Sequence, residues 1–398
     1  MRARLGRRFA ALVFPALVTV VALCEAGSAW ACPMSPVHDV SRLLANALED
    51  ARRLYWIKKD GKCGFIDETG QVVVEPRLDE AGEFSEGLAP VEIGGKWGYI
   101  DATGEVVIEP KFDTGSNSYW CRFQEGRARV QVDGRFGFID RTGRFTIEPR
   151  FDDAGLMAEG LVRVKVGEKW GFVDRNSKWV AKPQFEFAMG FSWSDAPPHL
   201  APVKVDGKWG YMNTEGKVVI GAQFDETFAF YEGLAYVKVG DKCGFINKRG
   251  ELVIPANFDS AGAFWEGLAP VKVGDEWGYV DKTGATAIEP QFESADNFTS
   301  GLARVRVAGR YGFIDKSGRF VVEPRFEEAL RFPGEGNAQL AAVRLDDKYG
   351  YVDRSGKMVI EPRFSRALAF DGPLARVWLD ETVGYIDATG RYVWEPTE

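Results

Sequence analysis

One short phrase recurs along the chain, and its spacing constrains the fold more than any other feature. The phrase is clearest at Trp97-Gly98-Tyr99-Ile100-Asp101. Its glycine returns ten times, at Gly64, Gly98, Gly137, Gly171, Gly210, Gly244, Gly278, Gly312, Gly350 and Gly384. Successive glycines lie 34 to 39 residues apart. A regular period of this length is typical of repeat architectures, so the sequence predicts an array of small units.

The unit from Leu200 to Glu232 reads as short strands joined by tight turns. Residues 202–205 alternate between outward and inward positions of a half-buried strand. Asp206-Gly207 is the two-residue signature of a type I′ hairpin, and a second turn follows at residues 213–216. Most other units end their third strand with Glu-Pro, as at Glu109-Pro110, and we expect the proline to stop the strand there. Each unit is therefore predicted to be a three-stranded antiparallel meander.

A two-residue hairpin fixes which side chains share a face. Val203 then lies opposite Gly210, and Lys204 lies opposite Trp209, so the ring and the glycine occupy different faces. The glycine would leave room for a neighbouring unit's backbone or for the opposite valine. Both faces are largely apolar, and units must stack to cover them. The repeat positions that carry this prediction include Trp97, Gly98, Trp170, Gly171, Trp209, Gly210, Trp277, Gly278, Tyr311 and Gly312.

The ends of the chain differ from the repeats. Residues 1–31 combine an arginine-rich start, an apolar stretch from Phe9 to Leu23 and a small-residue site at Ala29-Trp30-Ala31, which predicts a cleavable signal peptide. The apolar stretch is too short to cross a bilayer core of about 30 Å as a helix. Residues 36–54 have helical periodicity, and we expect the segment 32–56 to cap the open end of the first repeat. The repeat array then spans residues 57–398.

The expected fold is all-β. Ten stacked meanders can form an open β-solenoid that winds as a superhelix, which we expect first, or a propeller-like closed ring. The neutral-pH charge of −8 falls to −11 once the leader is removed, because four arginines and one glutamate leave with it. An acidic surface repels polyphosphate, so nucleic acid is not expected as a partner. No other stretch of the sequence is apolar enough to span a membrane.

Four cysteines follow the leader, namely Cys32, Cys63, Cys121 and Cys243. They allow three disulfide pairings in an oxidising compartment. Cys63 and Cys243 stand where most units have an aromatic ring, which favours buried thiols at those two positions.

The recurring phrase resembles the bacterial WG repeat. The resemblance rests on Gly-Lys-Trp-Gly-Tyr at 95–99 and 207–211, on the turn-strand-turn run at 101–113, and on Glu-Gly-Leu-Ala at 86–89 and 266–269. It covers residues 57–398, with local departures such as cysteine in place of the ring and Gly221-Ala222 in place of Glu-Pro. The resemblance implies a structural or interaction role and carries over no catalytic residue.

The sequence offers little for catalysis. It holds two histidines, His38 and His199, and neither lies in a metal-binding or catalytic spacing. Recurring aspartates such as Asp101 and Asp281 are explained by turn formation, although a chance carboxylate pair would leave a hydrolase as a remote alternative. We expect neither a cofactor nor a metal ion, and no enzyme activity.

Insertions indicate where a ligand would bind. Three loops lengthen the repeat at the same point of the unit, over residues 114–123, 188–200 and 328–340. Insertions at one point of a repeat emerge on one edge of an array, commonly its binding face. The candidate ligand-binding residues in these loops are Tyr119, Trp120, Phe191, Trp193 and His199. The alternative is that these aromatic side chains fold back over apolar surface.

A row of cations is a second candidate surface. It consists of one residue per unit at Lys165, Lys204, Lys238, Lys272, Arg306 and Arg344. The row could bind an acidic peptide or an anionic polysaccharide. The alternative is that these side chains cover the rings opposite them and pair with nearby carboxylates.

The sequence therefore predicts an exported, periplasmic or secreted, non-catalytic scaffold that binds a protein through loops on one edge. A lipoprotein attached at Cys32 is disfavoured by the bulky Trp30. The alternative binding function is recognition of cell-envelope carbohydrate or peptidoglycan by aromatic stacking.

Overall fold

The computed structural model describes residues 53–113, 121–191, 197–334 and 338–397. By its internal contacts the chain divides into two compact units, residues 1–48 and 49–398, and every described residue belongs to the second. The expected signal peptide and most of the expected capping segment lie outside the described residues. Tyr55 and Trp56, which we assigned to that segment, belong to the first strand. Within the described part of the chain, no helix has both the length and the apolar character needed to cross a membrane.

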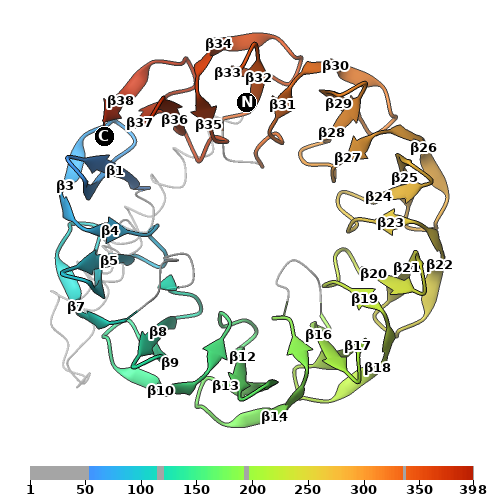
Figure 1. Ribbon diagram of the computed structural model, residues 1–398, viewed down its shortest axis with the longest axis horizontal. Coiled ribbons are helices and arrows are strands. Elements are labelled where there is room, and N and C mark those ends of the chain that lie inside the picture. Colours follow the sequence, from blue (N-terminus) through green and yellow to red (C-terminus); the bar gives the residue numbers. More distant parts are fainter. Residues whose placement is uncertain (1–52, 114–120, 192–196, 335–337, 398) are drawn as a thin grey trace, which may run out of the picture. The chain divides into compact units, whose positions relative to one another are not determined.

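The second unit consists of ten small antiparallel sheets, which we number as blades 1 to 10 in chain order (Figure 1). Each blade has three long strands. The first long strands are β1 (Tyr55–Lys59), β5 (Ala89–Ile93), β8 (Ala128–Val132), β12 (Leu161–Val166), β16 (Leu200–Val205), β20 (Leu234–Val239), β24 (Leu268–Val273), β28 (Leu302–Val307), β32 (Ala341–Leu345) and β36 (Ala375–Leu379). The second are β2 (Lys62–Ile66), β6 (Lys96–Ile100), β9 (Arg135–Ile139), β13 (Lys169–Asp174), β17 (Lys208–Asn213), β21 (Lys242–Asn247), β25 (Glu276–Asp281), β29 (Arg310–Asp315), β33 (Lys348–Val352) and β37 (Thr382–Ile386). The third are β3 (Val72–Leu78), β7 (Val106–Phe112), β10 (Phe145–Phe151), β14 (Trp179–Phe185), β18 (Val218–Phe224), β22 (Leu252–Phe258), β26 (Thr286–Phe292), β30 (Phe320–Phe326), β34 (Met358–Phe364) and β38 (Tyr392–Thr397).

Among the described residues, eight blades have a fourth strand that the sequence did not predict. These short inner strands, which lie toward the centre of the ring in Figure 1, are β4 (Glu80–Ala81), β11 (Asp153–Ala154), β15 (Phe187–Ala188), β19 (Glu226–Thr227), β23 (Ser260–Ala261), β27 (Ser294–Ala295), β31 (Glu328–Ala329) and β35 (Arg366–Ala367). Each pairs antiparallel with the first long strand of its blade. Two residues are too few to show a strand pattern in the sequence, which is why the three-stranded prediction was incomplete.

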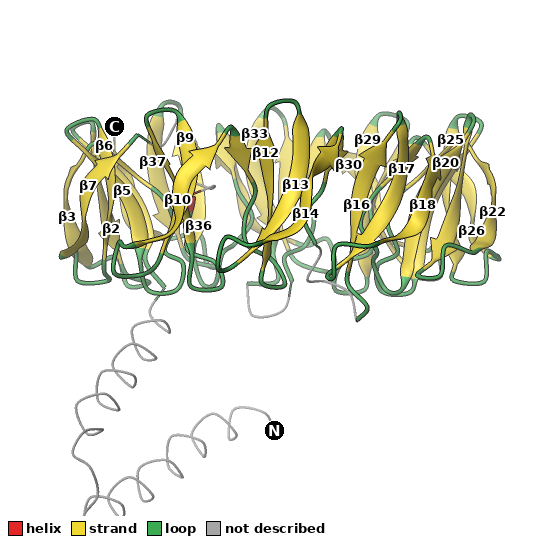
Figure 2. Ribbon diagram, turned by 90° about the horizontal axis from the view of Figure 1, so that it is seen from below, coloured by secondary structure: helices red, strands yellow, loops and turns green. Residues whose placement is uncertain are grey.

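The predicted register of the hairpin is confirmed. Val205 pairs with Lys208, Lys204 with Trp209 and Val203 with Gly210. Asp206 and Gly207 have φ angles of 48° and 76°, and two successive positive φ angles are the requirement of a type I′ turn. These hairpin turns lie along one edge of the ring, and the turns between the second and third long strands lie along the other (Figure 2).

The blades stack as the two-sided apolar pattern predicts. Tyr211 of blade 5 packs with Val237 and Ile246 of blade 6. On the opposite face of blade 5, Val203 and Met212 pack with the rings of blade 4. The ring-bearing face of each blade therefore covers the valine-bearing face of the next, and the core is a series of inter-blade layers.

The glycine of the recurring phrase has a different neighbour from the one we expected. A Cβ atom at Gly98 would lie 2.4 Å from the carbonyl oxygen of Ile108 and 2.7 Å from the nitrogen of Pro110. The close backbone is thus the third strand of the same blade. Pro110 also lies within β7 and does not end it, because shifts in register form a bulge where the ladder needs no proline N–H.

The open superhelix that we expected first is wrong, and the closed ring is observed. Blades 1 and 10 pack together through a core cluster that includes Tyr55 and Tyr385, whose ring centroids are 5.5 Å apart. The Tyr385 hydroxyl donates to the carbonyl of Trp56 at 2.7 Å, and Thr397 Oγ1 donates to the carbonyl of Lys58 at 2.6 Å. Closure buries the apolar faces that an open array would expose at its two ends.

Candidate functional site

A groove opens on the inner side of blades 6 to 9. Its volume is about 440 Å³, and it is lined by Phe228, Tyr231, Tyr236, Ala263, Trp265, Asn297, Thr299 and Arg331. Most of these residues lie in the segments that join each inner strand to the first long strand of the same blade. We call it the aromatic groove. Its volume falls within the range of typical small-ligand sites.

Exposed aromatic rings dominate the groove. Trp265 is 40% exposed and Phe228 is 44% exposed, although large apolar side chains are usually covered in a folded protein. The rings of Tyr231 and Trp265 lie 5.7 Å apart and are inclined by 44°. Burial raises the pKa of Tyr236, and the nearby Glu226 carboxylate raises it further, so its phenol stays protonated at neutral pH. The groove therefore offers apolar faces together with a hydroxyl donor.

The far end of the groove is polar and carries a cation. Arg331 Nε lies 3.3 Å from Asp296 Oδ2, and the same oxygen lies 2.7 Å from Arg304 Nε. One carboxylate is thus shared between two guanidinium groups, which leaves excess positive charge at this end. The side-chain amide of Asn297 donates to the carbonyl of Ala263 at 3.1 Å and so links neighbouring blades.

Of the candidate residues named from the sequence, Phe191 and His199 lie in the described part of the chain, and neither lines the groove. Tyr119, Trp120 and Trp193 lie outside the described residues. Phe191 is 6% exposed and packs edge-on against Phe172, which fits the alternative that it covers apolar surface. His199 lies beside Glu159, with 3.6 Å between Nε2 and Oε1. The third expected loop, residues 328–340, does contribute Arg331.

The sequence contains a signal for the groove that we did not use. In the run Phe-x-Glu-Gly-Leu before the first long strand, the variable residue is small or polar in several units, as at Ser85. It is Tyr231 in blade 6 and Trp265 in blade 7. The aromatic groove is therefore marked in the sequence by two large rings at a position that is small or polar in several other units. Both rings stand in units of regular length.

The side chains of the cation row mainly pair with carboxylates or cover aromatic rings, which is the second of the two roles expected for them. Lys238 pairs with Glu226 at 3.0 Å, and Arg344 pairs with Glu328 at 2.9 Å. Lys204 lies 5.9 Å from the centroid of the Trp209 ring, and Arg306 lies 5.6 Å from that of Tyr311. These cations are therefore engaged with side chains of their own blades.

The cysteines and recurring aspartates also have structural roles. Cys63 and Cys243 are buried free thiols, Cys121 is buried, and Cys32 lies outside the described residues. Burial raises the pKa of the Cys63 and Cys243 thiols. The side chain of Asp281 accepts hydrogen bonds from the Thr283 amide and hydroxyl, which is an Asx turn. Among the described residues, no group of three or more His, Cys, Asp or Glu side chains is arranged to hold a metal ion.

A family model gives the identity of the repeat. The model described as "WG containing repeat" matches nine successive segments, at residues 64–97, 97–136, 136–170, 170–209, 209–243, 244–277, 277–311, 311–349 and 349–380. The chain belongs to the WG-repeat family. The first eight matched segments each run from one WG pair to the next, and the ninth ends at residue 380, shortly before the last pair at Val383-Gly384.

Solved structures similar to this WG-repeat chain share little sequence with it. A eukaryotic initiation factor matches at 9% identity over 87% of this chain and 98% of its own, with a TM-score of 0.47. BamB from Moraxella catarrhalis matches at 13% identity over 84% and 94%, with a TM-score of 0.33. Hsv2p from Kluyveromyces lactis matches at 12% identity over 50% and 74%, with a TM-score of 0.33. No curated protein matches the sequence.

Proposed function

We propose that this WG-repeat ring is an exported, non-catalytic scaffold that binds a protein partner at the aromatic groove. The observation that carries the proposal is the cluster of Phe228, Tyr231 and Trp265, whose rings line one cavity on the inner side of the ring. Aromatic residues and arginine supply most of the binding energy at protein interfaces. The groove combines such rings with Arg331 at its polar end.

The repeat architecture suits this function. The groove residues come from four successive blades, so the inter-blade layers hold them in fixed relative positions. Pre-positioned side chains lose little conformational entropy when a partner binds. The lengthened segment 328–340 contributes Arg331 to the groove, so a partner bound in the groove would contact one of the three expected loops.

Carbohydrate recognition is the second candidate, and one observation favours it. Tyr231 and Trp265 present adjacent ring faces, and Asn297 and Thr299 place hydrogen-bonding groups beside them. Aromatic faces next to polar side chains suit the alternating apolar and hydroxyl-rich surfaces of a sugar. Envelope polysaccharide is therefore the competing ligand class.

Binding measurements on groove variants separate the two classes. We expect Trp265→Ala to weaken capture of the partner from envelope extract by about tenfold or more, because hot-spot truncations cost at least about 2 kcal/mol. Phe320→Ala is the matched control, since Phe320 is an exposed ring on the third strand β30. A glycan panel with the same variants tests the sugar alternative. Equal loss in both variants, or no loss in either, contradicts a site at the groove.

Export is part of the proposal and rests on the leader pattern of residues 1–31. The small-residue site predicts that the mature chain begins at Cys32. Fractionation of expressing cells followed by N-terminal sequencing tests this directly. A mature chain that begins at Met1 and stays in the cytoplasm contradicts export and leaves the groove measurements unaffected.

A further inference from the structure

The aromatic groove holds hydrogen-bond donors that the protein leaves unused. Tyr231, Tyr236 and Trp265 line the groove together. Among the residues that the structure describes, none forms a hydrogen bond with the two phenol hydroxyls or with the indole Nε1. These three donors are therefore available to a ligand.

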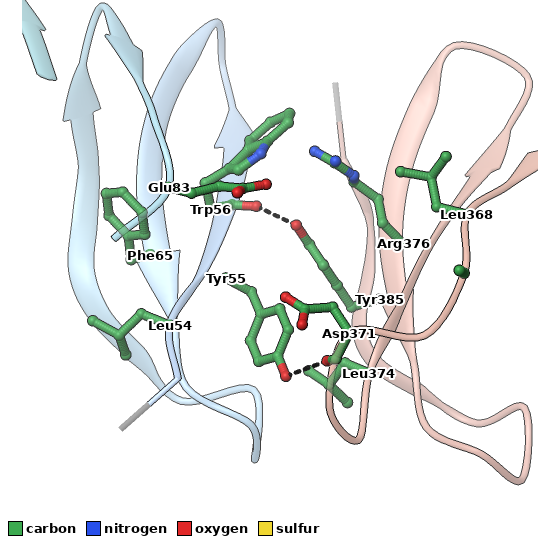
Figure 3. A pocket seen from close by; sticks show the side chains of 11 residues that line it. Leu54, Tyr55, Trp56, Phe65, Glu83, Leu368, Asp371, Leu374, Arg376 and Tyr385 are labelled. Atoms are coloured by element: carbon green, nitrogen blue, oxygen red, sulfur yellow. Dashed lines mark hydrogen bonds between the residues drawn. The ribbon is translucent and has the colours of Figure 1, made fainter. Parts of the chain in front are cut away.

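Tyrosines elsewhere between blades use their hydroxyls to join the blades. Figure 3 shows two of them at the pocket where blade 10 meets blade 1. Tyr55 donates to the carbonyl of Asp371 at 2.7 Å. Tyr385 donates to the carbonyl of Trp56, also at 2.7 Å. These hydroxyls help to close the ring, whereas the two phenols of the aromatic groove form no such contact with the described residues.

One of the unused donors stands at a position that joins two blades in other units. Tyr236 pairs with Phe245 across its hairpin. The equivalent register position in blades 3, 4 and 8 is an arginine, namely Arg129, Arg163 and Arg304. Each of these arginines donates to the alanine carbonyl of the next blade's inner strand. In blade 6 a phenol replaces the arginine and lines the groove.

The lining of the groove is rich in donors and poor in acceptors. An indole N–H and a guanidinium can only donate hydrogen bonds. No aspartate or glutamate is among the described residues that line the groove. Arg331, whose side chain is 56% exposed, shares the Asp296 carboxylate with Arg304, so part of its charge remains for a ligand. A ligand therefore needs acceptors, and it gains from an anionic group near Arg331.

A proline-rich peptide has the complementary chemistry. Its carbonyls are strong acceptors, and proline has no backbone N–H that would need an acceptor in return. Consecutive prolines favour the polyproline II helix, which has no internal hydrogen bonds and leaves its carbonyls exposed. Aromatic-lined grooves bind such segments because their conformation is already ordered. A sugar, in contrast, donates from its hydroxyls and would leave donors without acceptors in this lining.

We infer that the aromatic groove binds a proline-rich segment of the partner protein in the polyproline II conformation. Proline rings pack against the faces of Tyr231 and Trp265. The Tyr236 hydroxyl donates to a carbonyl of the segment, and a flanking acidic residue pairs with Arg331. This recognition rests on the function proposed above and specifies which kind of segment the site accepts.

Fluorescence anisotropy with a fluorescein-labelled nonapeptide, Asp-Pro-Pro-Ala-Pro-Pro-Ala-Pro-Asp, tests this recognition. The full chain is expected to bind the peptide saturably. An aspartate at each end allows the segment to bind in either direction. Replacing the five prolines by alanine restores backbone N–H groups and removes the ordered conformation, so we expect binding to weaken at least about tenfold.

The acidic ends of the peptide test the role of Arg331. Replacing both aspartates by asparagine is expected to weaken binding about two- to fivefold, because an exposed ion pair is lost. In the variant Arg331→Gln the two peptides should bind equally. Equal binding of the two peptides to the unaltered chain contradicts the contact with Arg331.

Variants of the protein locate the peptide in the groove. We expect Trp265→Ala to weaken binding at least about tenfold, because a hot-spot ring is removed. Tyr236→Phe removes one hydroxyl and keeps the ring, and it should weaken binding about two- to tenfold through the lost hydrogen bond. Tyr392→Phe is the matched control, because it removes the same group from the outer strand β38, away from the groove lining. It should leave binding unchanged.

Absence of saturable binding overturns the inference, as does equal binding of the alanine peptide. Equal loss in Tyr236→Phe and Tyr392→Phe overturns it as well. A glycan that binds where the peptide does not, and is lost in Trp265→Ala, assigns the groove to sugar instead. The function proposed above survives failure of the peptide if Trp265→Ala still weakens capture of a protein partner from envelope extract, and it fails if that capture is unchanged.

Discussion

Gly210 shows how a single residue of the WG pair shapes a blade. A Cβ atom at this position would lie 2.4 Å from the carbonyl oxygen of Ile220, in the third strand of the same sheet. Backbone cannot move away as a flexible side chain can, so a larger residue pushes the second and third strands apart. The glycine is therefore required by packing within the blade.

Alanine substitutions at two glycines of blade 5 test this requirement. We expect Gly210→Ala to lower the free energy of unfolding by about 1–3 kcal/mol, as overpacking does in dense cores. Gly221→Ala is the matched control, because nothing lies within 4 Å of its Cβ position and its φ is ordinary. Its effect should stay within about 0.5 kcal/mol. Urea unfolding followed by tryptophan fluorescence measures both, and similar losses in the two variants would show that the third strand yields easily.

At the scale of the element, the Asx turn between the second and third long strands is the best-predicted part of the unit. Its aspartate and glycine positions were assigned from sequence, and in the structure the Asp315 carboxylate accepts hydrogen bonds from the amides of Ser317 and Arg319. The hydroxyl of Ser317 is the main group that lowers the pKa of Asp315, to about 2. Asn213 and Asn247 accept the equivalent amide hydrogen bonds in blades 5 and 6.

The turns should make the fold sensitive to acid. The pKa of Asp315 is lowered from 3.8 to about 2 in the folded chain, so its contribution is complete above about pH 4 and is lost as the pH falls toward 2. The pKa values of Asp281 and Asp353 are lowered in the same way. We expect the triple variant Asp281→Asn, Asp315→Asn, Asp353→Asn to be less stable than the parent above about pH 4, and the difference in the free energy of unfolding to shrink as the pH falls toward 2. Urea unfolding at several pH values, followed by circular dichroism, measures this difference, and a difference that does not change with pH would contradict the linkage.

Neighbouring blades are also joined by a repeated carboxylate contact. Glu266 of blade 7 accepts from the amide of Gly301 at 2.9 Å and pairs with Lys316 at 3.1 Å, both in blade 8. Because the two side chains are 26% and 45% exposed, solvent screens the pair. A double-mutant cycle on Glu266→Ala and Lys316→Ala is expected to give a coupling of about 0.2–1 kcal/mol.

The pair Glu215 and Lys217 provides the control for this cycle. It lies within one turn, and its side chains are 68% and 74% exposed. Its coupling should be close to zero. If the two cycles give the same value, the contact between Glu266 and Lys316 does not join the blades.

The element scale also shows what the sequence could not reveal. Strand register, the hairpin type and the two apolar faces follow from alternation and turn residues, which are local signals. The inner strands do not, since two residues such as Ser260 and Ala261 carry no period. In blade 2 the third strand continues past Pro110 because it contains a bulge. The position of that bulge depends on close packing of its backbone against Gly98, which is not a local sequence signal. The aromatic groove was missed because its rings stand in units of regular length.

At the scale of the whole molecule, closure of the ring depends on the rotation between neighbouring blades, which no single repeat reveals. Each blade fixes its contact with the next, but whether ten blades return to the start depends on the small rotation between neighbours. That rotation is set by side-chain volumes in every layer, and small differences accumulate over the array. The contacts between Tyr55 and Tyr385 decide the matter, although the two residues are separated by almost the full length of the array.

Closure also bears on where the proposed binding site lies. A ring has no terminal repeat, so its apolar faces are covered by neighbouring blades except where side chains depart from the repeat. The aromatic groove is such a departure, because Tyr231 and Trp265 stand where several other units have a small or polar residue.

The most direct test of this account measures the distance between the first and last blades in solution. Spin labels at Lys59→Cys and Leu379→Cys occupy the last residue of the first long strands of blades 1 and 10. Labels at Val239→Cys and Val273→Cys occupy the same position in the adjacent blades 6 and 7, with Cys24 and Cys32 replaced by serine in both variants. Double electron–electron resonance should give the same mean distance and width for the two pairs if the ring is closed. A clearly longer or broader distribution for residues 59 and 379 would contradict closure.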